Sequence, residues 1–312
     1  MNFSAKHPAV SLAFVGLGRQ GQRHLASAEK LRGREDVKLA AVVDIDPRCA
    51  DLAARFGLPY FADVNELPVD VNACVVATPT CTHLPVGEIL LERGIDLLVE
   101  KPVAANYAQT QALVRLAEQR GRIFQVGYLE RYHPSFASVR PDFSLPAEIV
   151  SKRSTRGNSI RSLTDLVREL MIHDLDILAT WLDCPPVGAM WSGIRQDEDE
   201  IEGTLDLVFS GGHKARLVAQ SGARMVVRRT TVRSGVNAWE FEWGNSDAPS
   251  WTRTAGATGP NRTEPADDPI TMQLRAFIRA VRTRSLPEIN GTSALKAMQL
   301  AEEAIRALPV AA

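Results

Sequence analysis

Up to residue 126, short apolar runs alternate with segments whose apolar residues recur at helical spacing. The runs are VSLAFVG (10–16), VKLAAVV (37–43), NACVVA (72–77), IDLLV (95–99) and RIFQV (122–126). A run that is apolar at every position is typical of a strand buried on both faces, and helices between such strands are the crossovers of a parallel sheet. The pattern predicts an α/β domain over residues 1–126 with a doubly wound parallel sheet.

The remaining residues, 127–312, follow a different pattern. A helical segment over 162–183 precedes four segments in which apolar and polar residues alternate: IEGTLDLVF, HKARLVAQSG, RMVVRRTTVRS and VNAWEFEW. Such alternation predicts an open, mainly antiparallel sheet with one packed face. A polar loop over 245–269 and two helices near 270–284 and 292–307 complete the chain. We therefore expect a second, α+β domain at 127–312.

Composition excludes several classes of protein. The formal net charge of −1 gives no general attraction to nucleic acid or to an anionic membrane. The four cysteines are dispersed without a CxxC pair, which favours free thiols in a reducing cytoplasm, and the six histidines have no metal-ligand spacing. We find neither a signal peptide nor an apolar run approaching the roughly 20 residues of a membrane helix. The expectation is a cytoplasmic protein without a metal.

A glycine-rich turn follows the first predicted strand. In FVGLGRQGQRH, the residues Gly16, Gly18 and Gly21 form GxGxxG between a strand and a helix, the context in which this motif binds the pyrophosphate of a dinucleotide. Asp44 ends the second strand, where a carboxylate can accept hydrogen bonds from a ribose diol. A purely structural turn with a helix-capping aspartate is the alternative. Because Asp46 rather than a cation follows closely, we expect NAD to be preferred over NADP, although Arg48 is near.

Three further loops should leave the same edge of this Rossmann sheet. They are TPTCTH (78–83), EKP (100–102) and GYLERYHP (127–134), each directly after an apolar run. Ligands of open α/β sheets bind outside the carboxyl ends of the strands. Lys101 is therefore expected where a nicotinamide would lie, rather than on an ordinary solvated loop.

The helical segment SLTDLVRELMIHDLDILATWL carries a narrow polar stripe. Ser162 with Asp165 is a plausible capping start. At about 100° per residue one face gathers five polar residues, Asp165, Glu169, His173, Asp176 and Thr180. Glu169 and His173 form an i, i+4 pair, so the carboxylate could orient the imidazole. The alternative is a solvated helix face, which would usually contain lysine.

These residues together resemble the Gfo/Idh/MocA family of NAD(P)-dependent oxidoreductases, over nearly the whole chain. The likeness rests on GLGRQG, Asp44, TPTCTH, EKP, QVGYLERYHP and ELMIHDLD. It implies catalysis by Lys101 and His173, with Glu169 standing where the family commonly has aspartate. The cofactor-binding residues implied are Gly16, Gly18, Arg19, Gln20, Gly21, Asp44, Thr78, Pro79, Thr80, His83, Glu100 and Lys101.

Within the family the chain looks most like the nucleotide-sugar dehydrogenases. That likeness implies oxidation of the 3-hydroxyl of UDP-N-acetylglucosamine, and a homodimer or homotetramer formed through the C-terminal sheet. Arginines suit a diphosphate because their guanidinium groups bind phosphate oxygens in pairs. Beside Lys101 and His173, the substrate-binding candidates are Tyr128, Arg131, His133, Arg156, Asn158 and Arg161, with Arg153 also suitable. Tyr128 and His133 could instead pack. A free sugar or inositol as substrate, and a non-catalytic NAD-binding regulator, remain open.

Overall fold

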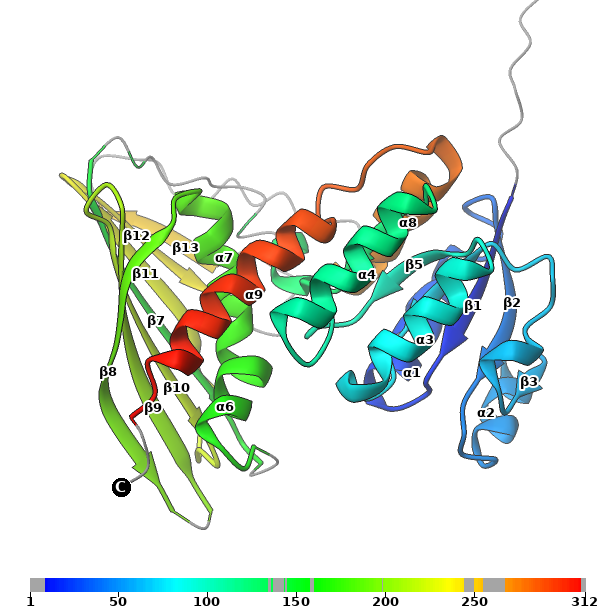
Figure 1. Cartoon of the computed structure of the whole chain (residues 1–312), viewed down its shortest axis with the longest axis horizontal. Coiled ribbons are helices and arrows are strands. Elements are labelled where there is room, and N and C mark those ends of the chain that lie inside the picture. The colour runs from blue at the N-terminus through cyan, green and yellow to red at the C-terminus, as the bar shows by residue number, and fades with distance from the viewer. Residues whose placement is uncertain are drawn as a thin grey trace, which may run out of the picture. The chain divides into compact units, whose positions relative to one another are not determined.

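The computed structural model describes residues 9–133, 136, 143, 145–157, 160–197, 199–243, 250–254 and 267–309 (Figure 1). The chain divides into two compact units. The N-terminal domain comprises Met1–Leu129 and Asp267–Leu295, and the C-terminal domain comprises Glu130–Ala266 and Lys296–Ala312. The boundary predicted after residue 126 is thus close, but the second domain is not continuous to residue 312.

The N-terminal domain contains a six-stranded parallel sheet with the strand order β3-β2-β1-β4-β5-β6. The five predicted strands are β1 (Val10–Val15), β2 (Val37–Val43), β4 (Ala73–Val76), β5 (Asp96–Val99) and β6 (Phe124–Val126), and the short β3 (Tyr60–Phe61) was not predicted. Between them lie α1 (Arg19–Leu31), α2 (Cys49–Arg55), η1 (Val64–Glu66), α3 (Thr80–Glu92) and α4 (Tyr107–Gln119). This order is that of a doubly wound Rossmann sheet, which confirms the predicted fold.

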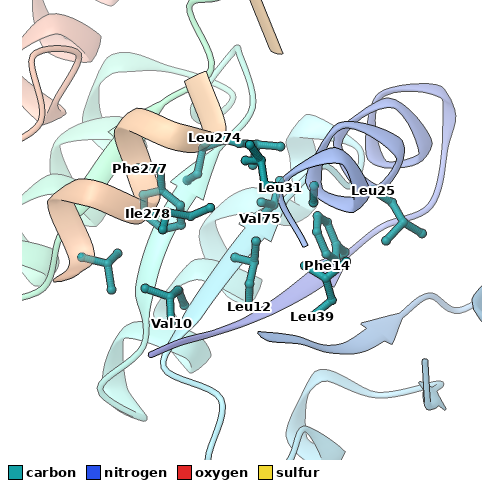
Figure 2. Close-up of a cluster of buried hydrophobic side chains, with 14 of the residues drawn as sticks. Val10, Leu12, Phe14, Leu25, Leu31, Leu39, Val75, Leu274, Phe277 and Ile278 are labelled. Carbon is teal, nitrogen blue, oxygen red and sulfur yellow. The ribbon is translucent and has the colours of Figure 1, made fainter. Parts of the chain in front are cut away.

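Helix α8 (Pro269–Thr283) belongs to this domain, which corrects its assignment to the second one. Its apolar face, with Leu274, Phe277 and Ile278, packs in one buried cluster with Leu12 and Val75 of the sheet (Figure 2). An amphipathic helix presents the same apolar stripe to any sheet, so its periodicity predicts the helix but not its partner. The position of α8 in the chain was therefore misleading.

The C-terminal domain contains a seven-stranded sheet with the order β13-β12-β11-β7-β10-β9-β8. Its strands are β7 (Ala147–Thr155), β8 (Pro186–Gln196), β9 (Ile201–Phe209), β10 (Lys214–Ser221), β11 (Arg228–Ser234), β12 (Asn237–Glu242) and β13 (Ser250–Thr254). Among the strands described in this seven-stranded sheet, only β7 and β10 pair in parallel. The prediction of a mainly antiparallel sheet is therefore confirmed. Strand β13 falls within the predicted loop 245–269, whose residues 245–249 and 255–266 lie outside the described part.

A helical layer covers one face of this sheet (Figure 1). It contains α6 (Leu163–Asp165), the π-helical segment η3 (Leu166–Met171), α7 (Ile172–Leu182) and the later part of α9 (Gly291–Arg306). The predicted cap is confirmed, because the Ser162 hydroxyl accepts the N–H of Asp165 at 3.1 Å. The π-helical segment was not predicted.

None of the helices described is both long and apolar enough to cross a membrane. In the same part of the chain, no three side chains of the metal-ligating types gather as an ion would require. All four cysteines are free thiols.

Candidate active site

The glycine turn after β1 is required by close backbone packing. Gly16 has φ +90°, and a Cβ atom there would lie 2.8 Å from the carbonyl carbon of Ala77. A Cβ atom on Gly21 would lie 1.9 Å from the carbonyl oxygen of Gly16. Both positions therefore exclude any larger residue, whatever the turn binds.

Gly18 has a different reason to be glycine. A Cβ atom at Gly18 would meet nothing within 4 Å, so no packing contact excludes a side chain. Gly18 is the N-cap of α1 and supplies no side-chain cap to the helix. Exposed Arg19 and half-buried Gln20 begin the first turn of that helix. An open, uncapped helix N-terminus beside a bare backbone suits the pyrophosphate of a dinucleotide, so these residues fit NAD.

Asp44, at the end of β2, is fixed against the glycine turn. Its Oδ2 accepts the backbone N–H of Leu17 at 2.6 Å, and its Oδ1 accepts that of Asp46 at 2.9 Å. Each carboxylate oxygen retains capacity for another hydrogen bond, because an ionised carboxylate has about four acceptor sites. The carboxylate is thus held beside the turn in a form that can still accept from ribose hydroxyls.

Arg48 is paired with Asp46, which bears on the choice between NAD and NADP. The guanidinium Nη2 lies 2.6 Å from Asp46 Oδ2, and Nε donates to both oxygens of that carboxylate. The hydrogen bonds from Arg48 hold the pKa of Asp46 below its ordinary value. The cation that could attract a 2'-phosphate already has a carboxylate partner, and Asp44 adds a further negative charge.

His83 connects two of the predicted ligand loops. Its Nε2 lies 2.8 Å from the carbonyl oxygen of Thr78, and its Nδ1 lies 2.9 Å from that of Pro102. The ring is buried, while Thr78 and Thr80 are half-buried and Pro79 is exposed. The structure thus places His83 as a brace between the TPTCTH and EKP turns, and Thr78, Pro79 and Thr80 as the accessible part of the first.

The EKP turn is built on a buried ion pair. Glu100 Oε1 lies 2.6 Å from Nε2 of His24, a residue of α1 that is completely buried. Burial opposes ionisation of Glu100, but the hydrogen bond and charge of His24, together with the charge of Lys101, lower its pKa. The Lys101–Pro102 bond is cis, as the sequence allowed. Lys101 is half-buried between two buried neighbours.

In the C-terminal domain His173 pairs with a carboxylate that the sequence did not single out. Its Nδ1 lies 2.7 Å from Oε2 of Glu130, which belongs to the 3-10 turn η2 (Leu129–Tyr132). The His173 side chain is 17% exposed, whereas Glu130 is buried. His173 therefore has one nitrogen held by a carboxylate from behind while part of the ring stays accessible.

Glu130 is in turn held by Arg153. The Arg153 Nη1 donates to Glu130 Oε1 at 2.8 Å, while Nε and Nη2 donate to the two oxygens of Asp174 at 2.9 and 3.0 Å. Burial opposes ionisation of Glu130, but the charges of His173 and Arg153 hold its pKa well below the ordinary value. Ser151 completes the network by donating to Asp174 at 2.7 Å. The three donor nitrogens of Arg153 are engaged in this buried network, which argues against Arg153 as a diphosphate ligand.

The predicted partner of His173, Glu169, lies in the π-helical segment and is exposed. A π-helical turn closes from residue i to i+5, so it shifts the register that an α-helix would give to i, i+4 pairs. Nδ1 of His173 lies against Glu130, and a catalytic role for Glu169 stays a prediction. Glu130 belongs to GYLERYHP, the loop directly after β6 that was predicted to leave the ligand-binding edge of the sheet. That position is the sequence feature that could have singled out Glu130.

Asp176, one turn beyond His173, is almost completely buried. Its nearest cationic partner is Arg131, whose Nη1 lies 3.8 Å from Oδ1, too far for a good hydrogen bond. Burial raises the pKa of Asp176 to about 8; Arg131 opposes this rise, and the charge of Glu130 adds to it. The buried Arg131 is thus turned toward a carboxyl group, while a diphosphate contact by Arg131 stays a prediction.

The other predicted substrate residues have varied surroundings. Tyr128 is buried, and the ring of buried His133 packs edge-on against Trp243 with the centroids 5.7 Å apart. Both observations favour the packing alternative. Arg156 and Arg161 are exposed, which keeps them available to a ligand, and Asn158 lies outside the described residues.

Comparison with known proteins identifies oxidoreductases and dehydrogenases that are similar to this chain. Residues 10–128 match the model of an oxidoreductase family with an NAD-binding Rossmann fold, Gfo/Idh/MocA. A UDP-N-acetylglucosamine 3-dehydrogenase of Acidithiobacillus ferrooxidans is 28% identical over 221 residues, covering 70% of this chain and 69% of the relative. An inositol 2-dehydrogenase of Rhizobium meliloti is 28% identical over 57% of this chain and 56% of the relative.

Solved structures share the fold of the chain. The structure of the UDP-N-acetylglucosamine 3-dehydrogenase from Acidithiobacillus ferrooxidans superposes with a TM-score of 0.85 at 22% identity, covering 96% of this chain and 97% of that one. A levoglucosan dehydrogenase in complex with NADH gives a TM-score of 0.80 at 14% identity, with 96% of each chain covered.

We predict that the protein binds NAD at least about tenfold more tightly than NADP, or about 1.4 kcal/mol, because Asp44 repels a 2'-phosphate. Asp44→Asn should weaken NAD binding and narrow the preference, since the amide oxygen can still accept from Leu17 but carries no charge. Isothermal titration calorimetry with both dinucleotides measures this. Equal or tighter binding of NADP by the unaltered protein would contradict the assignment of Asp44 to the ribose.

We predict a pH-dependent effect of Asp176→Asn on stability. A folded pKa of about 8 against an ordinary 3.8 means that the native state keeps a proton which the unfolded chain releases, so this group's contribution to stability falls as pH rises through that window. The asparagine variant should therefore gain at least about 2 kcal/mol relative to the unaltered protein between pH 5 and pH 8. Urea unfolding at both pH values measures it, with the exposed Asp197→Asn as control. An equal loss of stability at both values would mean that Asp176 is ionised beside Arg131.

Proposed function

We propose that the chain, whose residues 10–128 match the model of the Gfo/Idh/MocA oxidoreductase family, uses NAD to oxidise a secondary hydroxyl of a nucleotide sugar. The best candidate is the 3-hydroxyl of UDP-N-acetylglucosamine, which would become a 3-keto sugar. The observation that carries a dehydrogenase function is the pairing of partly accessible His173 with buried, ionised Glu130. The choice of sugar is supported by the relative of that specificity, which the chain matches over 70% of its length.

The Glu130–His173 pair provides a general base. A carboxylate 2.7 Å from Nδ1 favours the tautomer with its proton on that nitrogen, which leaves the Nε2 lone pair to accept the proton of the substrate hydroxyl. The imidazolium formed is then stabilised by the negative charge of Glu130. Glu130 cannot turn away, because Arg153 holds its other oxygen.

Lys101 provides a positive charge next to the reacting oxygen. Its ammonium group hydrogen-bonds the reacting oxygen and stabilises the negative charge that develops as the proton leaves. Bound NAD supplies the nicotinamide that accepts the hydride from the carbon being oxidised. Arg156 and Arg161 are exposed and suit the diphosphate of the substrate, since guanidinium groups bind phosphate oxygens in pairs.

The substrate is tested with UDP-, dTDP- and GDP-sugars, free sugars and inositols, each incubated with NAD while the absorbance of reduced cofactor is followed. We predict the highest kcat/KM for UDP-N-acetylglucosamine. Inositol as the best substrate would favour the alternative supported by the inositol 2-dehydrogenase relatives. NAD binding without oxidation of any compound would favour a regulator.

Lys101→Met should lower kcat by roughly 10²–10³-fold, because loss of one donor to a developing oxyanion has that effect. NAD affinity should change much less, since the interaction forms mainly in the transition state. His173→Asn should also be severely impaired, and the double variant should be far less than multiplicatively worse. Steady-state kinetics of the three variants measures this. Near-normal turnover of Lys101→Met would show that EKP is an ordinary solvated loop without a catalytic role.

We also propose a homodimer or homotetramer formed through the C-terminal sheet. Met190 and Val208 are exposed apolar residues, 63% and 40% accessible, on the outward face of β8 and β9. Met190 pairs with Asp206 and Gly188 with Val208, so the two apolar side chains are diagonal neighbours. An apolar patch on a sheet face is typical of a protein interface.

Met190→Asp combined with Val208→Asp should reduce the mass measured by light scattering to that of a 34.1 kDa protomer. Charged groups at an apolar contact carry a large desolvation cost, which weakens association. Val69→Asp, a fully exposed apolar residue of the N-terminal domain, is the control and should keep the assembly. A monomeric unaltered protein at micromolar concentration would end this proposal.

A further inference from the structure

Two buried histidines hold the EKP turn, and one of them has no other bond. His24 is completely buried in α1, and its single hydrogen-bond partner in the described part of the chain is Glu100, because Nδ1 has none. Burying an imidazole with one nitrogen unsatisfied is unfavourable, and an apolar residue would pack there at lower cost. The presence of histidine at this position is therefore explained by what it does to Glu100.

Glu100 also contacts the backbone of Lys101. While Oε1 pairs with His24, Oε2 accepts the backbone N–H of Lys101 at 3.2 Å. The backbone of Gly127 packs closely against this carboxylate, since a Cβ atom at Gly127 would lie 2.9 Å from Oε2. The carboxylate thus contacts His24 through one oxygen and the Lys101 backbone through the other, so the His24 contact helps to hold the backbone from which the Lys101 side chain begins.

The turn is fixed from its far side as well. His83 lies 2.9 Å from the carbonyl oxygen of Pro102, the residue after Lys101. Lys101 thus lies between two anchored neighbours and is the one residue of EKP that is not fully buried. An arrangement in which only the central side chain reaches solvent is suited to presenting an ammonium group in one position.

We propose that His24 is a positioning residue for Lys101, acting through the Glu100 carboxylate. The proposal rests on the proposed function, in which Lys101 stabilises charge on the reacting oxygen. Without the His24 donor, the buried carboxylate would lose its main partner and would be protonated or displaced. The Lys101 N–H would then lose its acceptor, and small displacements of a catalytic group are costly in rate. A merely structural pair would instead affect folding and NAD binding together.

The kinetic experiment compares His24→Leu, His24→Gln and Glu100→Gln. We expect His24→Leu and Glu100→Gln to lower kcat by roughly 10–100-fold, with KM and the Kd of NAD changing less than about threefold. His24→Gln keeps an N–H donor and should recover most of the rate. His213→Leu, which removes a histidine bonded to the backbone N–H of Ala147 in the other domain, is the matched control and should leave kcat unchanged.

A second measurement needs no substrate, so it separates this proposal from the proposed function. A pulse of an amine-reactive ester followed by peptide mass spectrometry gives the acylation rate of Lys101, with exposed Lys152 as internal reference. We expect the relative rate at Lys101 to change at least about threefold in His24→Leu and Glu100→Gln but not in His24→Gln or His213→Leu.

The outcomes are distinct. A loss of kcat rescued by glutamine, or the altered labelling where no sugar is oxidised, supports the proposal. If His24→Leu does not fold, Glu100→Gln decides in the same way. Unchanged labelling with normal turnover overturns it, and so does a loss of rate that glutamine does not rescue and that is accompanied by weakened NAD binding.

Discussion

Burial of the Glu130 carboxylate is the constraint on which the C-terminal site depends. An ionised carboxylate without water is very unfavourable unless cations and donors surround it. Glu130 has His173 on one oxygen and Arg153 on the other, and Arg153 is neutralised further by Asp174. These residues come from η2, β7 and α7, so one electrostatic requirement fixes three elements together. His173 is therefore held by this carboxylate as well as by its own helix, α7.

The N-terminal domain has the same physical arrangement beside Lys101, the other residue that we propose acts on the substrate. Glu100 is buried and paired with His24, and the next residue, Lys101, is the one that remains accessible. In both domains a desolvated glutamate lies behind a residue that we propose contacts the substrate, and that residue is only partly exposed. A rigid charged support of this kind costs no reorganisation when charge develops during the reaction.

The sequence predicted features that depend on neighbours along the chain. The parallel strands, the glycine turn, the cap at Ser162 and the position of Lys101 after β5 are local patterns, and all are found where expected. Features that depend on distant partners were missed. Helix α8 packs on the first sheet, residues 166–171 form a π-helical segment, and Glu130 reaches His173 from another element. Residue type and periodicity do not specify which distant charge a buried group will meet.

The arginines show why substrate recognition is harder to predict than the catalytic frame. Four arginines looked equivalent for a diphosphate in the sequence, yet Arg153 is engaged in the buried network while Arg156 and Arg161 are exposed. The buried network needs its partners to remain folded, so those residues cannot change independently. An exposed guanidinium has no such constraint and can be replaced with little effect on stability. The exposed arginines can therefore change without disturbing the buried network, whereas Arg153 cannot.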